Sequence, residues 1–447
     1  MAKPNYVEFT KEMKKDYTIL LPMMLPVHFK IIEQILKGAG YHVELLETSG
    51  RQIVEEGLKN VHNDTCYPAL LVIGQMIDAL KSGKYDPKKT ALMITQTGGA
   101  CRASNYIFLL RKALEDSEFK DVPVISLNFM GLEKSSGFKL TPKMLIDAMF
   151  ALIYGDLIMW ISNQCKPYEK RKGDTQKVID KWVKELCDQF HSLKFLRVSK
   201  NYQSILKDFA AIPRTDTQKI RVGIVGEIYM KYAPLGNNHL EDFLIQEGAE
   251  PVVSGVLDFL LYCIENVMVD KKLYGKGNVP KFVASIGLKI LNRWQNQMIK
   301  QVKKHGVFRA PSSFSDVVNA ADGFINKGTK MGEGWLLTSE MLELIHSGVD
   351  NIVCTQPFGC LPNHIVAKGM MRKIKTVYPE ANIVAIDYDP SATPINQINR
   401  LKLMLSNAQL TQEMHQEEVA NESQKSKVSL PHKGHISLNN SRQGVSV

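Results

Sequence analysis

Short, almost wholly apolar segments alternate with amphipathic stretches in both halves of the chain, and this alternation constrains the fold most strongly. Strands that are covered by helices on both faces have continuous apolar sequences, which is typical of parallel sheets. The sequence therefore predicts an α/β protein with two parallel sheets. The expected strands are Thr18–Pro22, Val43–Glu47, Ala91–Thr95, Val122–Leu127, Ile220–Val225, Pro251–Ser254, Asn351–Cys354 and Asn382–Ile386.

The domain boundaries follow from where the alternation stops and restarts. We expect a first doubly wound, Rossmann-like lobe over residues 1–139, a helical connecting region over 140–215 and a second Rossmann-like lobe over 216–410. A final helix is expected at Asn399–Leu405. Residues 411–447 are rich in Gln, Glu, Asn, Ser and Lys, which favours a flexible tail. Open sheets of this kind bind ligands at the carboxyl ends of their strands, so two facing lobes predict a cleft.

Composition favours a soluble cytoplasmic protein. Hydrophobic residues make up 44% of the 447 residues and charged residues 23%, which is ordinary for a globular chain. The apolar stretches Met144–Ser162 and Val252–Val269 contain carboxylates, so they are expected to be core helices, and no membrane contact is expected. Met1–Asp16 lacks the apolar core of a signal peptide.

The net charge of +10 is compatible with an anionic cofactor tail or an acidic partner. The chain has no basic run with interleaved aromatic residues and no zinc-finger or helix-turn-helix signature, which argues against nucleic-acid binding.

Three of the seven cysteines lie where an expected strand gives way to an expected helix. They are Cys66, Cys101 and Cys360, and the segments around Cys101 and Cys360 resemble each other, with Thr-Gln, a Gly-containing turn and then the cysteine. By contrast, Cys187 and Cys263 lie in helix-like apolar stretches and are expected to be buried small hydrophobic residues. The remaining cysteines are expected to be structural as well: Cys165 and Cys354.

The placement of the three cysteines has a chemical meaning. Helix starts offer free N–H groups that stabilise a thiolate and lower the thiol pKa, and a thiolate is the form that binds iron. Gly98, Gly99 and Gly359 would let the backbone pass close to a bulky ligand. The spacing is compatible with two interpretations. The three thiolates could hold an iron–sulfur cluster, or the three residues could be unrelated core and turn cysteines. Cys354 could supply a fourth thiolate, although its strand position favours burial.

Several separated motifs resemble the 2-hydroxyacyl-CoA dehydratase superfamily, over roughly residues 17–405. The closest similarity is to the dehydratase-like C-terminal part of activase-fused members and to double-cubane cluster proteins. The matching segments are Asn63-Asp-Thr-Cys-Tyr-Pro-Ala69, Gln96-Thr-Gly-Gly-Ala-Cys-Arg-Ala-Ser-Asn-Tyr106, Lys166-Pro-Tyr-Glu169, Val225-Gly-Glu-Ile-Tyr229, Gly332-Glu-Gly-Trp-Leu336, Gln356-Pro-Phe-Gly-Cys-Leu-Pro-Asn-His364 and Asp387-Tyr-Asp-Pro390.

The resemblance implies paired Rossmann-like lobes and a cluster held by Cys66, Cys101 and Cys360. The cluster would be a single [4Fe-4S] cubane, as in the dehydratases that act through a ketyl radical, or a double-cubane [8Fe-9S] cluster, as in the sister branch that reduces small molecules. Both branches receive low-potential electrons from an ATP-hydrolysing activase. The chain has no GxxxxGK[ST] phosphate loop, so ATP would be used by a separate activase chain.

Other polar residues follow strand ends and are candidates for the site. Glu227 and His364 are the candidate catalytic residues, and Arg102 could pair with cluster charge or a CoA phosphate. Tyr229 and Asn237-Asn-His239 would line the crevice of the second lobe.

Three functions fit this sequence. The first is an activase-dependent iron–sulfur reductase, or alternatively an (R)-2-hydroxyacyl-CoA dehydratase subunit acting on an acyl-CoA. The second is a non-catalytic electron-carrier or binding subunit, and the third is a metal-free two-lobed binding protein. A homodimer, or a heterodimer with a related subunit, is expected for the first.

Overall fold

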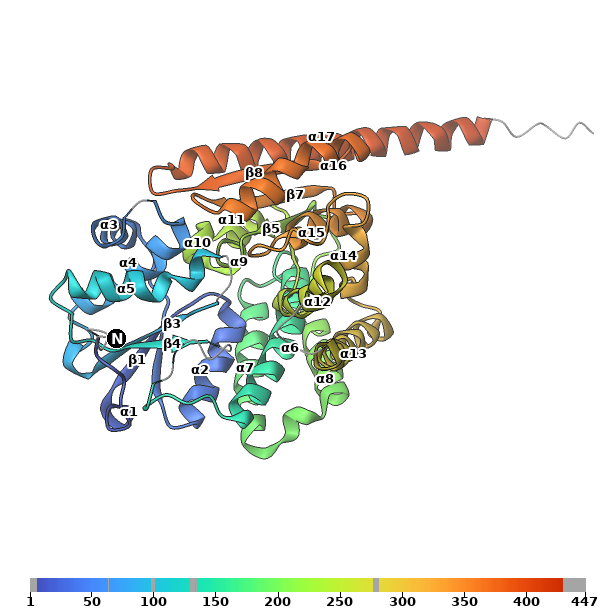
Figure 1. Cartoon of the computed structure of the whole chain (residues 1–447). Coiled ribbons are helices and arrows are strands. Elements are labelled where there is room, and N and C mark those ends of the chain that lie inside the picture. The colour runs from blue at the N-terminus through green and yellow to red at the C-terminus, as the bar shows by residue number, and fades with distance from the viewer. Residues whose placement is uncertain are drawn as a thin grey trace, which may run out of the picture.

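The computed structural model describes residues 6–62, 64–97, 101–128, 133, 135–275 and 281–428, and it confirms the predicted fold class. Two four-stranded sheets, each with all of its strands parallel, lie in two lobes with helices packed around them (Figure 1). The strand order is β2-β1-β3-β4 in the first sheet and β6-β5-β7-β8 in the second. The two lobes therefore share one winding pattern, and β3 is equivalent to β7.

The first lobe contains the expected strands with shifts of only one or two residues at their ends. Its strands are β1 (Thr18–Pro22), β2 (His42–Leu46), β3 (Thr90–Thr95) and β4 (Val124–Leu127). Its helices are α1 (Met13–Asp16), α2 (Pro26–Gly38), α3 (Arg51–Asn60), α4 (Tyr67–Lys81) and α5 (Tyr106–Glu115), with short 3-10 turns at Pro87–Lys89 and Arg102–Ser104.

The second lobe repeats the arrangement with more helices. Its strands are β5 (Arg221–Gly226), β6 (Glu250–Val253), β7 (Asn351–Pro357) and β8 (Asn382–Tyr388). Its helices are α9 (Ile228–Tyr232), α10 (Pro234–Asn237), α11 (Leu240–Gln246), α12 (Val256–Tyr274), α13 (Lys281–His305), α14 (Phe314–Ala320), α15 (Trp335–His346), α16 (Met371–Val377) and α17 (Pro394–Val428), with a π-turn at Asn363–Ala367 and a 3-10 turn at Lys368–Met370.

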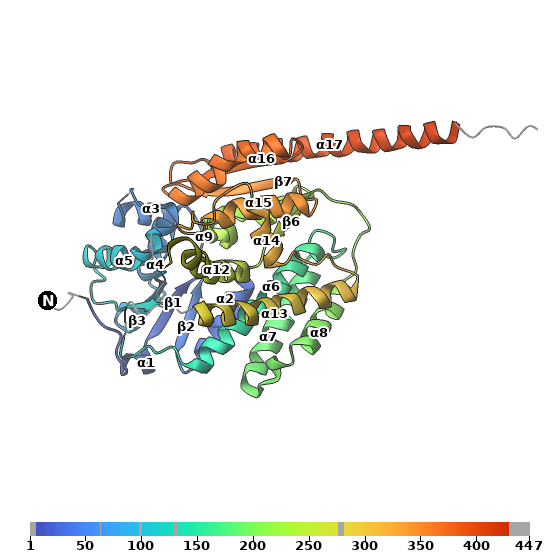
Figure 2. The same cartoon turned by 45° about the vertical axis from the view of Figure 1, so that its right-hand side comes forward.

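The expected connecting region is helical. It contains α6 (Pro142–Cys165), α7 (Asp174–Ser192) and α8 (Val198–Ala210), with a 3-10 turn at Lys194–Leu196, and these helices lie beside the first lobe in Figure 2. Within the described part of the chain, α6 alone is long and apolar enough to cross a membrane. Most of it is buried against other helices, and it carries the buried carboxylates Asp147 and Asp156. It is a core helix, as expected.

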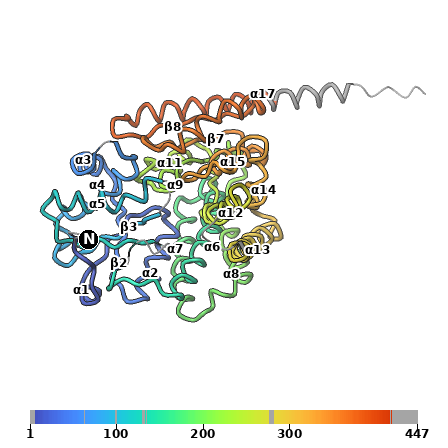
Figure 3. Tube along the Cα trace, in the orientation of Figure 1, coloured from blue at the N-terminus to red at the C-terminus, as the bar shows by residue number. Residues whose placement is uncertain are grey.

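The C-terminal helix is much longer than the sequence predicts. We expected a helix at Asn399–Leu405 and a loose segment from about Gln412, whereas α17 continues to Val428. Leu401, Met404 and Leu405 pack against the second sheet, where the first part of α17 lies beside β8 (Figure 3). Beyond them the helix runs past the body of the molecule (Figure 1). The polar composition of this segment indicates that it can bury little apolar area, and this is why a loose tail was expected. A helix that is packed at its start can nevertheless continue through polar residues that have adequate helix propensity.

The lobes share their hydrophobic core. One cluster joins Ile19 and Ile31 of the first lobe to α6 and to Trp335 of the second lobe. A second cluster joins Leu20 and Leu92 of the first sheet to Ile224 of the second. Because apolar area from both lobes is buried in common clusters, the relative position of the two sheets is part of the folded core.

A buried carboxylate adds a polar connection between the lobes. Asp156 of α6 places Oδ1 2.9 Å from Nε2 of His28 in α2. The backbone N–H groups of Val256 and Leu257, at the start of α12, donate to the same carboxylate over 2.9 Å and 3.0 Å. The negative charge therefore lies at the positive end of the α12 dipole, and one side chain contacts both lobes and the connecting region.

Replacing Asp156 by Ala should destabilise the whole fold. The change leaves two buried N–H groups and a buried imidazole without their acceptor, and we expect the free energy of unfolding to fall by about 3 kcal/mol. Urea denaturation followed by circular dichroism measures this loss. Asp188→Ala on the exposed face of α7 is the matched control and should change the free energy by less than about 0.5 kcal/mol. Equal stability of the two variants would contradict this role of Asp156.

Candidate functional site

Cys66 lies at the start of α4 in the first lobe. It is the residue immediately before the helix, in extended conformation, and its side chain is buried. Its Sγ lies 2.7 Å from the hydroxyl oxygen of Tyr106, the first residue of α5. A helix start and a phenol thus hold this thiol in a fixed position.

Cys101 and Cys360 follow equivalent strands, as the similarity of their sequences predicts. Cys101 comes after β3 and caps the 3-10 turn at Arg102–Ser104, and Cys360 comes after β7. A backbone N–H of the segment that follows lowers the thiol pKa at each of the three positions: Ala69 for Cys66, Ala103 for Cys101 and Asn363 for Cys360. The three cysteines therefore share one local setting, at the start of a helix or turn. Gly98 and Gly99 lie outside the described residues.

The two lobes meet directly at these cysteines. The backbone N–H of Tyr67 donates to the carbonyl oxygen of Phe358 over 3.0 Å, from one lobe to the other. Between that carbonyl and Cys360 lies Gly359, whose φ of 73° favours glycine. A Cβ at Gly359 would stand 2.8 Å from the carbonyl oxygen of Thr65 and 3.0 Å from the Cα of Cys66. A side chain here would push the lobes apart. This position therefore needs glycine both for its positive φ and for the close approach of the two lobes.

Two glutamates, the half-buried Glu227 and the buried Glu333, accompany the thiols, and both accept hydrogen bonds from the start of α9. Glu227 caps the helix by accepting from Met230 N over 2.9 Å, and Glu333 accepts from Ile228 N over 3.0 Å. Loss of solvation and, to a smaller extent, the charge of Glu333 raise the pKa of Glu227 to about 8. Burial also raises the pKa of Glu333. A carboxyl group with such a pKa holds its proton at neutral pH and can exchange it there.

The thiols and the glutamates interact electrostatically. The charge of Glu227 raises the thiol pKa of Cys66, Cys101 and Cys360, and Glu333 acts on Cys101 and Cys360. The Cys66 thiolate in turn raises the pKa of the other two thiols. The structure therefore brings together three of the predicted ligands and one of the two predicted catalytic residues.

The thiol pKa values differ from the sequence expectation. Helix starts were expected to lower them, whereas burial raises the pKa of Cys66, raises that of Cys101 to about 12 and raises that of Cys360 still more. The N–H groups of the turns lower each value, but burial among carboxylates outweighs them. In the chain without metal the three groups are thiols, and a metal would have to displace their protons.

His364, the second predicted catalytic residue, lies apart from this group. Its side chain is exposed and its Nδ1 contacts the side-chain amide of Gln356. Burial lowers the pKa of His364, and the charge of Lys368 adds to this effect. The exposed imidazole is therefore at the edge of the site. Because its pKa is lowered, it is neutral at physiological pH.

The other polar residues that the sequence analysis selected differ in exposure and in hydrogen bonding. Arg102 is exposed, donates to the backbone oxygen of Asp64 and lowers the pKa of Cys66. Tyr229 is buried, and its hydroxyl has no partner among the described residues. Asn237 caps α11 through Leu240 N, which is the structural role that its residue type allows.

The other cysteines are separated from the three by their surroundings. Cys354 is fully buried in β7, with Sγ 3.6 Å from Oδ1 of Asn363, as its strand position predicts. Cys165 is buried beside Arg214, and Cys187 is half-buried in α7. Cys263 differs from the expectation of burial because it lies on the exposed side of α12. A helix-like apolar context predicts helix formation better than it predicts which residues face the core.

The spacing of the ligating side chains limits the kind of metal group that the three thiols could bind. Among the described residues, no three His, Cys, Asp or Glu side chains are close enough together to bind a single metal ion. An iron–sulfur cluster imposes a different requirement, because each thiolate binds a different iron atom and the sulfur atoms stand farther apart than the ligands of one ion. Cysteine thiols from three separate segments are the type of donor that such a cluster uses.

Sequence reasoning missed two residues of this site. Tyr106 and Glu333 both lie in segments that carried the family resemblance, but neither was assigned a role. Glu333 stands between Gly332 and Gly334, both of which have positive φ values. A carboxylate between two glycines in a tight loop is a signal that could have drawn attention to it.

No known protein-family model matches the chain, and no curated protein matches it either. The fold and the site geometry therefore carry the functional argument, and the family resemblance stays a prediction.

Stability should depend on pH through Glu227. Folding raises the pKa of this carboxyl group from its ordinary value of 4.5 to about 8. As the pH rises through this window, the unfolded chain loses the proton while the folded chain keeps it, so stability falls by at most about 1.4 kcal/mol per pH unit. Glu227→Gln removes this dependence and still accepts from Met230 N. Its stability advantage over the unmodified chain should grow from pH 5 to pH 8 and then level off.

Urea denaturation of the metal-free protein at several pH values measures the difference between the two chains. Glu115→Gln, at an exposed position of α5, is the control and should follow the unmodified chain at every pH. A constant difference between the Glu227→Gln variant and the unmodified chain from pH 5 to pH 8 would show that Glu227 ionises normally when folded.

Proposed function

We propose that this chain is a cytoplasmic iron–sulfur protein of the 2-hydroxyacyl-CoA dehydratase and double-cubane type, which receives low-potential electrons from a separate ATP-hydrolysing activase and performs a difficult reduction. One observation carries the proposal. Three thiols, two of which follow equivalent strands, affect one another's pKa at the place where Gly359 of the second lobe approaches Cys66 of the first.

Cys66, Cys101 and Cys360 would hold the cluster. The bound cluster would accept single electrons at low potential and pass them to the substrate. N–H groups near ligand sulfurs stabilise thiolates and tune the reduction potential, and the backbone N–H groups of Ala69, Ala103 and Asn363 lower the pKa of the three thiols.

The remaining residues of the site would manage protons and exclude water. Glu333 is buried and Glu227 is half-buried, and the raised pKa of Glu227 suits a group that donates or accepts a proton near neutral pH. The phenol of Tyr106 holds the Cys66 thiol at 2.7 Å and, because it is buried, keeps water from that side. Electron transfer that is coupled to protonation requires a residue that exchanges protons and a residue that excludes water at the same site.

The surface around Cys360 suits an electron-donating partner. Four exposed apolar side chains lie on the two loops that border it: Met331, Phe358, Leu361 and Ile365. The two loops are adjacent, since a Cβ at Gly332 would lie 3.3 Å from the side chain of Pro362. A group of exposed apolar residues beside a site is typical of a protein-docking surface, and docking here would bring the activase close to the cluster.

A second candidate function is an (R)-2-hydroxyacyl-CoA dehydratase subunit that acts through a ketyl radical. The observation that favours it is Glu227, because dehydration requires removal of a substrate proton and a carboxyl group with a pKa near 8 is a suitable base. The two candidates differ in their cluster. A single cubane beside a cavity for a thioester supports the dehydratase, and a sulfide-bridged pair of cubanes, with six thiolates from two copies of the chain, supports the reductase.

The cysteine assignment is tested by iron content. After expression and purification without oxygen, the unmodified chain should be brown and carry roughly four irons, and Cys66→Ala, Cys101→Ala and Cys360→Ala should each lose most of that iron. Cys165→Ala and Cys187→Ala are the matched controls, because these residues lie in α6 and α7, and both should keep it. Iron and sulfide analysis with visible absorption spectra gives the measurement, and an anaerobic crystal structure of the same sample distinguishes one cubane from two.

Full iron content in any of the first three variants would remove that residue from the ligand set. An unmodified chain that is colourless and free of iron would overturn the proposal and favour a metal-free binding protein.

The partner requirement is tested by ATP turnover. Since the sequence lacks a phosphate loop, the isolated chain should release no phosphate from ATP above the background of a heat-denatured sample. Adding the cognate activase with a low-potential reductant should reduce the chain and change its visible spectrum. If the net charge of +10 recruits an acidic activase, the rate should fall with added salt. ATP hydrolysis by the isolated chain at the rate of the complete system would contradict this prediction.

A further inference from the structure

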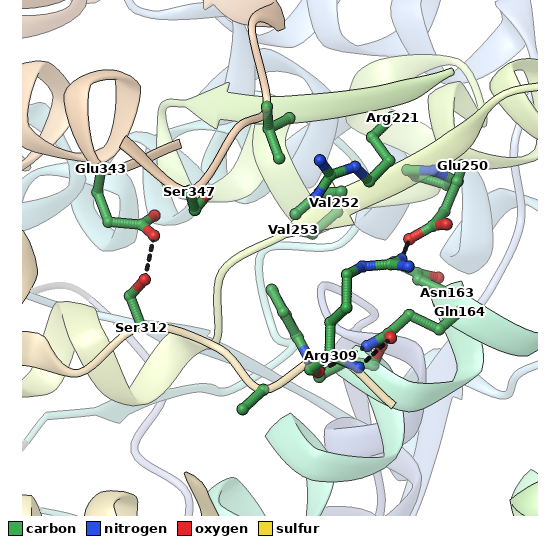
Figure 4. A pocket seen from close by; sticks show the side chains of 14 residues that line it. Asn163, Gln164, Arg221, Glu250, Val252, Val253, Arg309, Ser312, Glu343 and Ser347 are labelled. Atoms are coloured by element: carbon green, nitrogen blue, oxygen red, sulfur yellow. Dashed lines mark hydrogen bonds and ion pairs between the residues drawn. The ribbon is translucent and has the colours of Figure 1, made fainter. Parts of the chain in front are cut away.

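A polar cavity lies at the other edge of the second sheet. It has a volume of about 70 Å³ and opens beside the amino ends of the strands, where Arg221 begins β5 and Glu250 begins β6. Cys360 follows the carboxyl end of β7, so this cavity and the cysteine residues are on opposite edges of one sheet. Figure 4 shows Arg221 and Arg309 in this cavity together with Glu250.

The two arginines are held in place by the chain around them. The backbone of Arg309 is fixed by three hydrogen bonds: its N–H donates to Gln164 Oε1 over 2.8 Å, and its carbonyl accepts from Gln164 Nε2 over 3.1 Å and from Trp160 Nε1 over 2.6 Å. Arg221 begins a central strand and donates from Nη2 to the carbonyl of Gly348 over 2.8 Å. A ligand that binds here would find both guanidinium groups already positioned, which reduces the entropy cost of binding.

Positive charge in the cavity exceeds the negative charge that pairs with it. Arg309 pairs with Glu250, and this buried carboxylate also accepts from Tyr168 OH over 2.7 Å. Arg221 makes no ion pair within the described part of the chain, and in Figure 4 no dashed line reaches it. Its charge lowers the pKa of Arg309, which means that the two cations repel each other.

Two other carboxylates lie nearby and do not neutralise Arg221. Glu343 stands on the far side of the cavity, accepts from Ser312 and has its pKa raised by burial. Asp350 feels the charge of Arg221 but makes no ion pair with it, and burial raises its pKa as well. The unpaired N–H groups of Arg221 are therefore free to bind an oxyanion, for which the planar guanidinium is well suited.

We propose that this cavity binds a small organic anion, with a phosphate or carboxylate group between Arg221 and Arg309 and an apolar part against Trp160, Val252 and Val253. The lining supplies both parts of such a ligand, a cationic end and an apolar wall. This site goes beyond the function proposed for the cysteines and does not depend on it, because none of its residues belongs to that group.

The test uses the full-length purified chain and two probes that share a ring. Phenyl phosphate and benzoate are titrated separately by isothermal calorimetry in 150 mM salt, with neutral benzyl alcohol as a third ligand. At least one of the two anions should bind with saturation at one site per chain, and benzyl alcohol should not. Comparing the two anions identifies which oxyanion the site prefers.

Variants connect the binding to the cavity. Arg221→Gln should weaken the bound anion about tenfold, the loss expected for one charge-assisted pair, and Arg221→Lys should weaken it less. Lys300→Gln is the matched control, since it removes one charge from an exposed position of α13 and should change affinity less than twofold. Absence of saturable binding by either anion would overturn the proposal, and so would an equal effect of Arg221→Gln and Lys300→Gln.

Discussion

The position of the two lobes depends on the buried carboxylate of Asp156. It accepts from the first two N–H groups of α12 and pairs with His28, so its charge is compensated by one helix end and one side chain from opposite lobes. A buried charge with its partners removed would cost several kcal/mol, and only one arrangement of the lobes satisfies all three contacts. The common hydrophobic clusters then set the distance between the sheets, and this distance brings Gly359 against Thr65 and Cys66.

The close approach of the lobes creates an electrostatically costly site. Three thiols and two carboxyl groups lie together in poorly solvated positions, and the loss of solvation raises the pKa of each of them. The protonated thiol is the low-energy state at such a position when no metal is bound. Metal binding would release the thiol protons, so the affinity of the site for a metal group must rise with pH.

The fold and part of the site could be predicted from the sequence because both depend on local patterns. Continuous apolar runs predict all eight strands to within a few residues, and the repeated Thr-Gln-to-Cys pattern predicts the equivalence of Cys101 and Cys360. The sequence could not predict the sign of the thiol pKa shifts, because local N–H groups compete with burial among residues distant in sequence, such as Glu333. It also could not predict that His364 faces Gln356, since side-chain direction in a π-turn follows no simple period.

Helix α15 connects the two polar regions of the second lobe. Glu333 precedes it at the cysteine site, Glu340 pairs with the buried Lys231 in its middle, and Glu343 reaches the arginine cavity near its end. Ser254 donates to Glu340, so the end of β6 is tied to the same helix. One twelve-residue helix therefore carries or follows a carboxylate in each of these polar regions.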